Sequence, residues 1–151
     1  MRKADNPKKL RVRIELVREY VGQYYGKITG PESVLDMVPD LRISDREQVA
    51  VIYLSTPNQV LGVNICSSGT LNASMVHPRE VFKPAILANS ARIILVHNHP
   101  SGDCSPSSED FKVTERIKKA GILLGIELLD HVIVSASGYY SMQELGLIDK
   151  L

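Results

Sequence analysis

Residues 92–110 read RIILVHNHPSGDCSPSSED: an apolar run ends at two histidines, and a loop rich in proline and glycine leads to a Ser-x-x-Asp quartet. The apolar run is typical of a buried strand, and the quartet is typical of the first turn of a helix. His97 and His99 are two residues apart, so their side chains lie on one face of the strand end while Asn98 points to the other. This stretch predicts a strand, a loop and a helix that bring two imidazoles near a carboxylate.

Periodicity predicts further elements on both sides of this stretch. Residues 49–55 and 60–66 are rich in β-branched side chains and are joined by the turn-like TPNQ, which predicts a hairpin at the centre of a sheet. The other expected elements are a short helix over 31–39, a helix from Pro78, a helix over 107–124, a strand over 126–134, a short strand at Tyr139 and Tyr140, and a terminal helix over 142–145. This order predicts a three-layer α/β fold with a mixed sheet.

Residues 1–28 form a basic N-terminal arm. Residues 1–30 carry eight Lys and Arg against three Asp and Glu, whereas the remainder carries ten against fourteen. Alternating apolar residues over 10–17 predict a half-buried or edge strand, with a helix as the alternative. Such an arm can make weak contacts with a nucleic-acid backbone or an acidic partner, or it can lie in solvent without a binding role.

Composition narrows the class of protein. The 151 residues are 44% hydrophobic and 23% charged, which is typical of one globular core. No apolar run approaches the roughly 20 residues of a membrane helix, and no secretory signal is recognisable, so we expect a cytoplasmic protein without membrane contact. Cys66 and Cys104 form no CxxC pair, which argues against a disulfide framework or a cysteine zinc site.

His97, His99 and Asp110 are the candidate metal ligands. Asp110 lies one turn inside the predicted helix, where the loop can bring its carboxylate back to the strand end. Zinc held by two histidines and one carboxylate keeps a position open for water, so we expect one catalytic Zn²⁺ per chain. The alternative is that the histidines are polar loop residues and that Ser107 and Asp110 only form a capping box. A serine that caps a helix can still present its hydroxyl to a metal site.

Hydrolysis also needs a base that is not itself a ligand. The acidic candidates are Glu32, Glu47, Glu80, Asp103 and Glu109. Three other residues are interpreted as structural: His131 as a satisfied core residue or one that contacts a ligand, His77 as a helix-entry residue near the surface, and Cys104 as a loop thiol.

The pattern H-x-H-x7-S-x2-D, formed by His97, His99, Ser107 and Asp110 with a glutamate upstream, resembles the JAMM motif of the JAB/MPN metalloproteases. The strings HNHPSGDCSPSSED, HPREVFKPAI and LLDHVIVS are similar to those of the RadC-type bacterial branch. The resemblance covers about residues 29–151 and implies a cytidine-deaminase-like α/β domain with zinc beside the central sheet. The helix-hairpin-helix region of longer RadC proteins is expected to be absent.

The resemblance also implies roles for the site residues. It selects Glu47, because DREQVAVIYL places a glutamate immediately before the first core strand, and it makes Glu47 the base that activates a zinc-bound water. It implies that His97, His99 and Asp110 bind the zinc and that Ser107 polarises the scissile carbonyl or stabilises the oxyanion. The implied reaction is hydrolysis of a peptide or isopeptide bond in an unidentified peptide or protein conjugate. The alternatives are a non-enzymatic or DNA-associated accessory domain with a structural zinc, and a metal-dependent nuclease or phosphoesterase.

Overall fold

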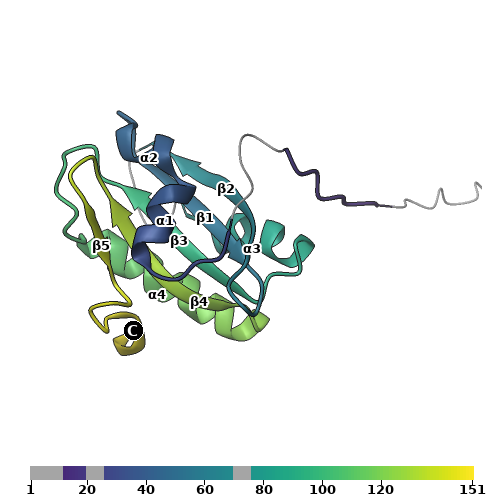
Figure 1. The fold of residues 1–151 in the computed structure, drawn as a ribbon. Coiled ribbons are helices and arrows are strands. Elements are labelled where there is room, and N and C mark those ends of the chain that lie inside the picture. Colours follow the sequence, from purple (N-terminus) through teal and green to yellow (C-terminus); the bar gives the residue numbers. More distant parts are fainter. Residues whose placement is uncertain (1–11, 20–25, 70–75) are drawn as a thin grey trace, which may run out of the picture.

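A mixed five-stranded sheet organises the chain in the computed structural model, which describes residues 12–19, 26–69 and 76–151 (Figure 1). The strands are β1 (Gln48–Leu54), β2 (Val60–Ser68), β3 (Arg92–Asn98), β4 (Glu127–Val134) and β5 (Tyr139–Ser141). Their spatial order is β2-β1-β3-β4-β5. Only β3 and β4 are parallel, and every other neighbouring pair is antiparallel.

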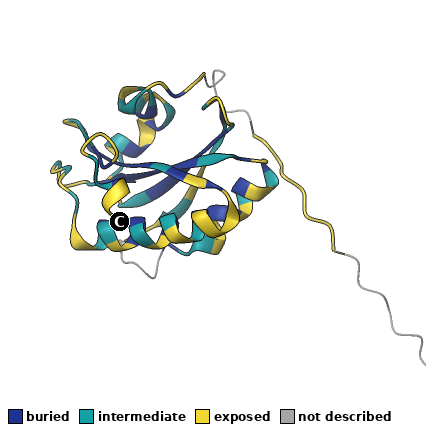
Figure 2. Cartoon of the chain, turned by 90° about the horizontal axis from the view of Figure 1, so that it is seen from below, coloured by how far each residue is buried: buried dark blue, intermediate teal, exposed yellow. Residues whose placement is uncertain are grey.

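Helices cover both faces of this sheet. One face packs against α3 (Pro78–Leu87) and α4 (Ser108–Leu124), and the other packs against α1 (Pro31–Met37) and α2 (Pro39–Ile43). Alternate residues of β1 supply the two cores: Val49, Val51 and Tyr53 on the α3/α4 face, and Ala50, Ile52 and Leu54 on the α1/α2 face. Figure 2 shows the buried sheet between helices whose outer surfaces are exposed. The expected three-layer α/β fold with a mixed sheet is confirmed.

Two of the expected elements differ in detail. The hairpin formed by β1 and β2 lies at one side of the sheet instead of its centre, since β2 is an edge strand and exposes Asn64 and Ile65. The single helix expected over 31–39 is two helices, because Pro39 begins a second one at its first position. Proline lacks an amide hydrogen, so it cannot continue the first helix but suits the start of the next.

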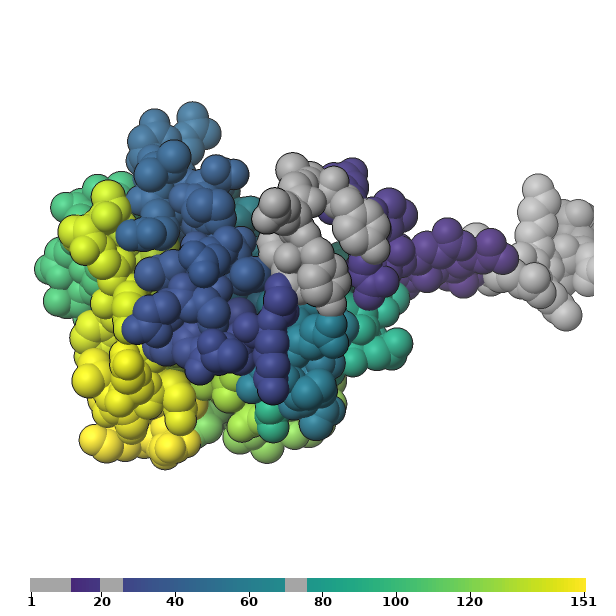
Figure 3. Space-filling view, viewed as in Figure 1, coloured from purple at the N-terminus to yellow at the C-terminus, as the bar shows by residue number. Residues whose placement is uncertain are grey.

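The elements predicted near the two ends of the chain are not formed in the structure. Residues 12–17 form no strand and no helix, and Val12, Ile14 and Val17 are 72%, 64% and 79% exposed. Residues 10 and 11 lie outside the described residues. An alternating pattern forms a strand only where a partner edge receives it, and Figure 3 shows the segment that includes residues 12–19 leading away from the body. The helix expected over 142–145 is a turn, followed by a 3-10 helix at Ile148–Lys150.

None of the helices in the described ranges combines the length and the apolar composition that crossing a bilayer requires.

Candidate metal centre

Asp110 lies at the start of α4 and contacts both predicted histidine ligands. Its Oδ1 is 2.8 Å from His97 Nδ1, and its Oδ2 is 3.4 Å from His99 Nε2. The capping box is also present: Ser107 Oγ accepts from the Asp110 amide at 3.2 Å, and Asp110 Oδ2 accepts from the Ser107 amide at 2.7 Å. The cap holds the carboxylate against the end of β3, so the capping role and the contact with the histidines coexist.

The hydrogen bonds of His97 and His99 define which ring nitrogens carry lone pairs. His99 Nδ1 is 2.7 Å from the Asp103 carbonyl, which can only accept, so Nδ1 donates. His99 Nε2, 3.4 Å from Asp110 Oδ2, carries a lone pair when the ring is neutral and donates to Asp110 when the ring is protonated. Burial alone would favour the neutral acid, but hydrogen bonds from His97 and His99 hold the pKa of Asp110 well below its ordinary value. An ionised Asp110 accepts from His97 Nδ1, and the buried His97 Nε2 has no hydrogen-bond partner.

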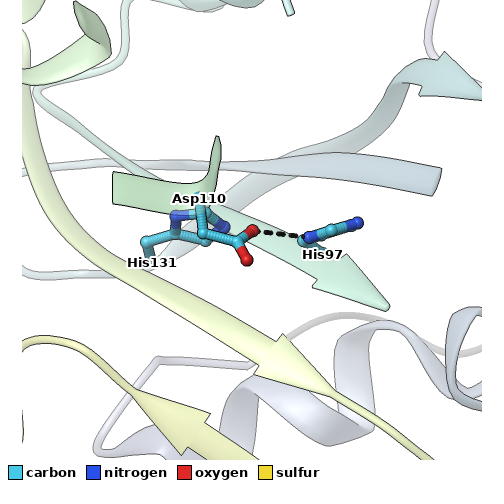
Figure 4. A group of neighbouring side chains, drawn as sticks. All are labelled: His97, Asp110 and His131. Atoms are coloured by element: carbon cyan, nitrogen blue, oxygen red, sulfur yellow. Dashed lines mark hydrogen bonds and ion pairs between the residues drawn. The ribbon is translucent and has the colours of Figure 1, made fainter. Parts of the chain in front are cut away.

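His131 joins this cluster from β4 (Figure 4). The parallel register pairs it with Leu95, so it faces α4 as His97 does. Thr114 Oγ1 donates to the Asp110 carbonyl at 2.6 Å and is 2.7 Å from His131 Nδ1. Because the hydroxyl has one hydrogen and the carbonyl takes it, the ring nitrogen is assigned as the donor to Thr114. One ligand atom from each of His97, Asp110 and His131 lies within 4.8 Å of the others. His131 is buried as expected but only half satisfied, because its Nε2 has no partner.

These donors fit a metal ion. Ring nitrogens of His97 and His99 face the two oxygens of the Asp110 carboxylate, and the Nε2 atoms of His97 and His131 are buried without a hydrogen-bond partner. A buried unsatisfied acceptor costs about 1–3 kcal/mol, and a divalent cation bound by nitrogen and carboxylate oxygen removes that cost. Histidines that bind metals also donate their other ring N–H to an oxygen, as His99 and His131 do here. The cluster can therefore hold a metal ion.

Glu47 lies directly before β1 and close to His99. The antiparallel register pairs Val49 with His97, so Glu47 is two residues before that pair and shares its face of the sheet. The side chain is half-buried, and its charge contributes to the raised pKa of His99, behind the larger effect of the hydrogen bond with Asp110. The carboxylate of Glu47, which the sequence predicts to be the base, therefore lies beside the cluster.

Asn98 holds the backbone on both sides of Glu47. Its Oδ1 accepts from the Gln48 amide at 2.6 Å, and its Nδ2 donates to the Arg46 carbonyl at 2.8 Å. Asn98 is 1% exposed and points to the α1/α2 face, opposite to His97, as the alternation along β3 predicts. The residue between the two histidines thus positions the segment that carries the candidate base.

The other acidic candidates have different surroundings. Glu32 accepts from Tyr139 on the α1 side, Glu80 pairs with Arg79 and Lys83, Glu109 pairs with Lys112, and the Asp103 carboxylate accepts from the Ser105 amide. Of these, the Asp103 carboxylate also interacts electrostatically with His99, but it is exposed and bound to its own loop.

Three further residues were assigned roles from the sequence, and the structure shows the contacts of each. Ser107 is exposed, and its hydroxyl donates to Asp110 Oδ2 at 2.7 Å. The Cys104 thiol points to the turn before β5, where it contacts Ser135 Oγ at 3.0 Å, so it is a loop thiol. His77 caps α3, and its Nδ1 accepts from the Arg79 amide at 3.1 Å.

Sequence reasoning missed the contributions of Asn98 and Thr114, and it interpreted His131 only as a core residue or one that contacts a ligand. Thr114 is one helical turn after Asp110, which predicts a shared face of the helix but no specific partner. His131 is a buried imidazole in a strand whose last three residues are apolar, a signal that it has a polar partner on the element packed against it.

Comparisons with known proteins place the chain among bacterial and archaeal relatives. The family described as "RadC-like JAB domain" matches residues 28–147. A UPF0758 protein of Desulfitobacterium hafniense is 52% identical over 122 residues, which cover 80% of this chain and 54% of the relative. A UPF0758 protein of Methanosarcina mazei is 49% identical over 81% of this chain and 54% of its own length. One from Caldanaerobacter subterraneus is 43% identical over 145 residues, which cover 93% and 62%.

The chain spans about half the length of the first two relatives, and their names state no activity. The match covers every strand and each of the candidate site residues, from Glu47 to His131. The chain belongs to the RadC-like JAB domain family.

Proposed function

We propose that the protein is a zinc-dependent metallohydrolase that cleaves peptide or isopeptide bonds, with His97, His99 and Asp110 as ligands. The observation that supports this most is the cluster of His97, His99 and Asp110, in which both histidines contact the carboxylate and the buried His97 Nε2 has no hydrogen-bond partner. Bound zinc would supply a Lewis acid that polarises a carbonyl and activates water for attack.

Glu47 is the proposed general base. A carboxylate outside the ligand set can accept the proton of the attacking water and return it to the leaving amine. Glu47 is beside His99, and Asn98 fixes the backbone before and after it, so its carboxylate is presented from a restrained segment. Restraint of this kind keeps a base within reach of the reacting water.

Ser107 is proposed to stabilise the oxyanion at the mouth of the site. It is exposed at the N-terminus of α4, where backbone N–H groups favour negative charge. In the structure its hydroxyl donates to Asp110, so in this role it would turn from the ligand to the substrate. The proposed substrate is a peptide or a protein conjugate.

The first experiment is the metal content of protein purified without added zinc. We expect about one zinc per chain in the wild type, from the one set of donors found in the described ranges, and none in the His97→Ala/His99→Ala double variant. Wild-type protein without metal would contradict the proposal. Metal without hydrolysis, together with salt-sensitive nucleic-acid binding that disappears when residues 1–28 are deleted, would favour the accessory-domain alternative.

The second experiment separates Glu47 from the ligands. Glu47→Gln should keep its metal and lose hydrolysis of a peptide and isopeptide panel by about 10²–10⁴-fold, the usual contribution of a general base. Glu109→Gln is a matched control, because Glu109 is a partly buried acid near the site that pairs with Lys112. Wild-type turnover in Glu47→Gln would exclude Glu47 as the base.

A further inference from the structure

The ring of His99 lies between two hydrogen-bond acceptors. Its Nδ1 is 2.7 Å from the Asp103 carbonyl, and its Nε2 is 3.4 Å from Asp110 Oδ2. A neutral imidazole has one N–H hydrogen, so the two acceptors compete for it. When the Asp103 carbonyl takes the hydrogen, Nε2 keeps its lone pair for a metal ion. When Asp110 takes it, that lone pair is lost. The position of the Asp103 carbonyl therefore decides whether His99 Nε2 can bind a metal.

The loop that carries this carbonyl is bonded to a second loop on both sides of Asp103. The chain over residues 99–107, here called the metal loop, forms neither helix nor strand. The Ser137 hydroxyl, in the turn between β4 and β5, donates to the Gly102 carbonyl at 3.0 Å. The Cys104 thiol is 3.0 Å from another serine hydroxyl of the same turn. The two loops lie side by side in Figure 1, so the turn supports the metal loop next to Asp103.

The turn between β4 and β5 is itself restrained. Ser135 is 1% exposed, and its amide donates to the Gly138 carbonyl at 2.9 Å. Its Oγ accepts from the Ser137 amide at 3.2 Å. Arg42 of α2, 93 residues earlier in the sequence, donates from Nε to the Ser135 carbonyl at 3.3 Å. A turn held in this way can fix a loop that has no regular structure of its own.

We infer that Ser137 is a positioning residue for His99. Its hydroxyl has one hydrogen, which the Gly102 carbonyl accepts. This bond holds the neighbouring Asp103 carbonyl where it takes the His99 hydrogen, and so keeps the lone pair on His99 Nε2. Groups that orient a metal-binding histidine through its other nitrogen are part of how a protein retains a metal. The inference rests on His99 as a ligand in the proposed function but not on peptidase activity.

The first measurement locates the His99 hydrogen in the metal-free chain, labelled with ¹⁵N-histidine, at a pH where the ring is neutral. Long-range ¹H–¹⁵N spectra distinguish a ring with hydrogen on Nδ1 from one with hydrogen on Nε2, and His99→Gln assigns the signals. His77 is an internal reference for the second form, because its Nδ1 accepts from the Arg79 amide. We expect hydrogen on Nδ1 of His99 in the wild type and a shift towards Nε2 in Ser137→Ala. Ser137→Thr keeps the hydroxyl and should retain the wild-type spectrum.

The second measurement is Zn²⁺ affinity, by competition with a chromophoric chelator. Ser137→Ala should weaken Zn²⁺ binding about 2- to 10-fold, the change in affinity that corresponds to one ordinary hydrogen bond, and Ser137→Thr should restore it. Ser33→Ala is a matched control, because the Ser33 hydroxyl also donates to a main-chain carbonyl, that of Gly30, at 2.6 Å beside α1. It should lower the urea midpoint and leave the Zn²⁺ affinity unchanged.

The outcomes separate this inference from the proposed function. A purely structural Ser137 predicts that Ser137→Ala lowers only the urea midpoint. Either an unmoved His99 hydrogen or an unchanged Zn²⁺ affinity in that variant therefore overturns the inference alone. A shifted hydrogen with weakened Zn²⁺ binding, in a protein that hydrolyses no peptide, leaves the inference standing and overturns the proposed function. A wild-type chain that binds no Zn²⁺ overturns both.

Discussion

Adjacent residues on β3 differ sharply in how their polar atoms are satisfied. Asn98 points to the α1/α2 face, and its oxygen and nitrogen both have backbone partners. His97 points to the α3/α4 face, where its Nε2 is buried without a partner. Each side chain is 1% exposed, so burial is the same and only the bonding differs. A satisfied buried polar group stabilises the scaffold, whereas an unsatisfied imidazole nitrogen beside a carboxylate and a second histidine is available to bind a metal ion.

The largest expected effect comes from removing the carboxylate at the centre of the unsatisfied face. Asp110→Ala should abolish stoichiometric metal, because the two histidines that contact Asp110 would lose the anion between them. If the metal ion is present at 100 times its Kd, loss of binding also removes about 2.7 kcal/mol from the free energy of unfolding. Elemental analysis and urea unfolding measure the two effects. Glu109→Ala is the neighbouring control, and a metal-loaded Asp110→Ala protein would contradict the assignment.

Replacing Asn98, whose polar atoms are hydrogen-bonded, should lower the free energy of unfolding and leave the metal content unchanged. Asn98→Leu leaves the Gln48 amide and the Arg46 carbonyl without their partner, which should destabilise the fold by about 1–3 kcal/mol. Turnover should fall as well, because the segment that carries Glu47 is released. Asn98→Asp keeps the acceptor for the Gln48 amide and should lie between wild type and Asn98→Leu. Loss of metal in Asn98→Leu would show that the two faces are not independent.

The stability of the metal-free protein should depend on pH because the α3/α4 face holds a buried histidine, His131. Burial lowers the pKa of His131 to about 3, against about 6.5 for an unfolded chain. Between these values the unfolded state binds a proton that the folded state does not, so stability falls as the pH decreases through that window. The slope contributed by one such group is up to about 1.4 kcal/mol per pH unit.

His131→Phe should lack this component, so the difference between its urea midpoint and that of the wild type should change between about pH 4 and 7, the part of the window accessible to measurement. The comparison with wild type isolates His131 from His99, whose raised pKa acts in the opposite direction. Curves that stay parallel over this range would show that His131 is not a buried neutral imidazole.

The smallest expected effect is at Cys104. Its thiol contacts Ser135 and Gly138 instead of the cluster, so Cys104→Ala should leave the metal content unchanged. Loss of these contacts should cost at most about 1 kcal/mol, the net value of an ordinary hydrogen bond. Elemental analysis checks the first statement and urea unfolding the second. A drop in bound metal would bring Cys104 into the ligand set.

Local patterns predicted the fold wherever an element is defined by its own residues. The β-branched runs of β1 and β3 and the capping box of α4 are of this kind. The strand expected over 10–17 is not formed in its described part, residues 12–17, because a strand needs an edge to pair with, and no pattern within the segment supplies one. The prediction of a helix over 142–145 was wrong, because a short terminal segment takes its conformation from the residues it packs against.

For the site, the sequence by itself determined that His97, His99 and Asp110 meet, since one strand, one loop and one helix turn carry all three. Resemblance was needed to select Glu47, which is fifty residues before His97. Only the tertiary structure decided that Asn98 positions Glu47 and that Thr114 and His131 join the cluster. The physical reason is that the direction of an imidazole lone pair depends on what its other nitrogen bonds to, and for His131 that partner lies on a different element.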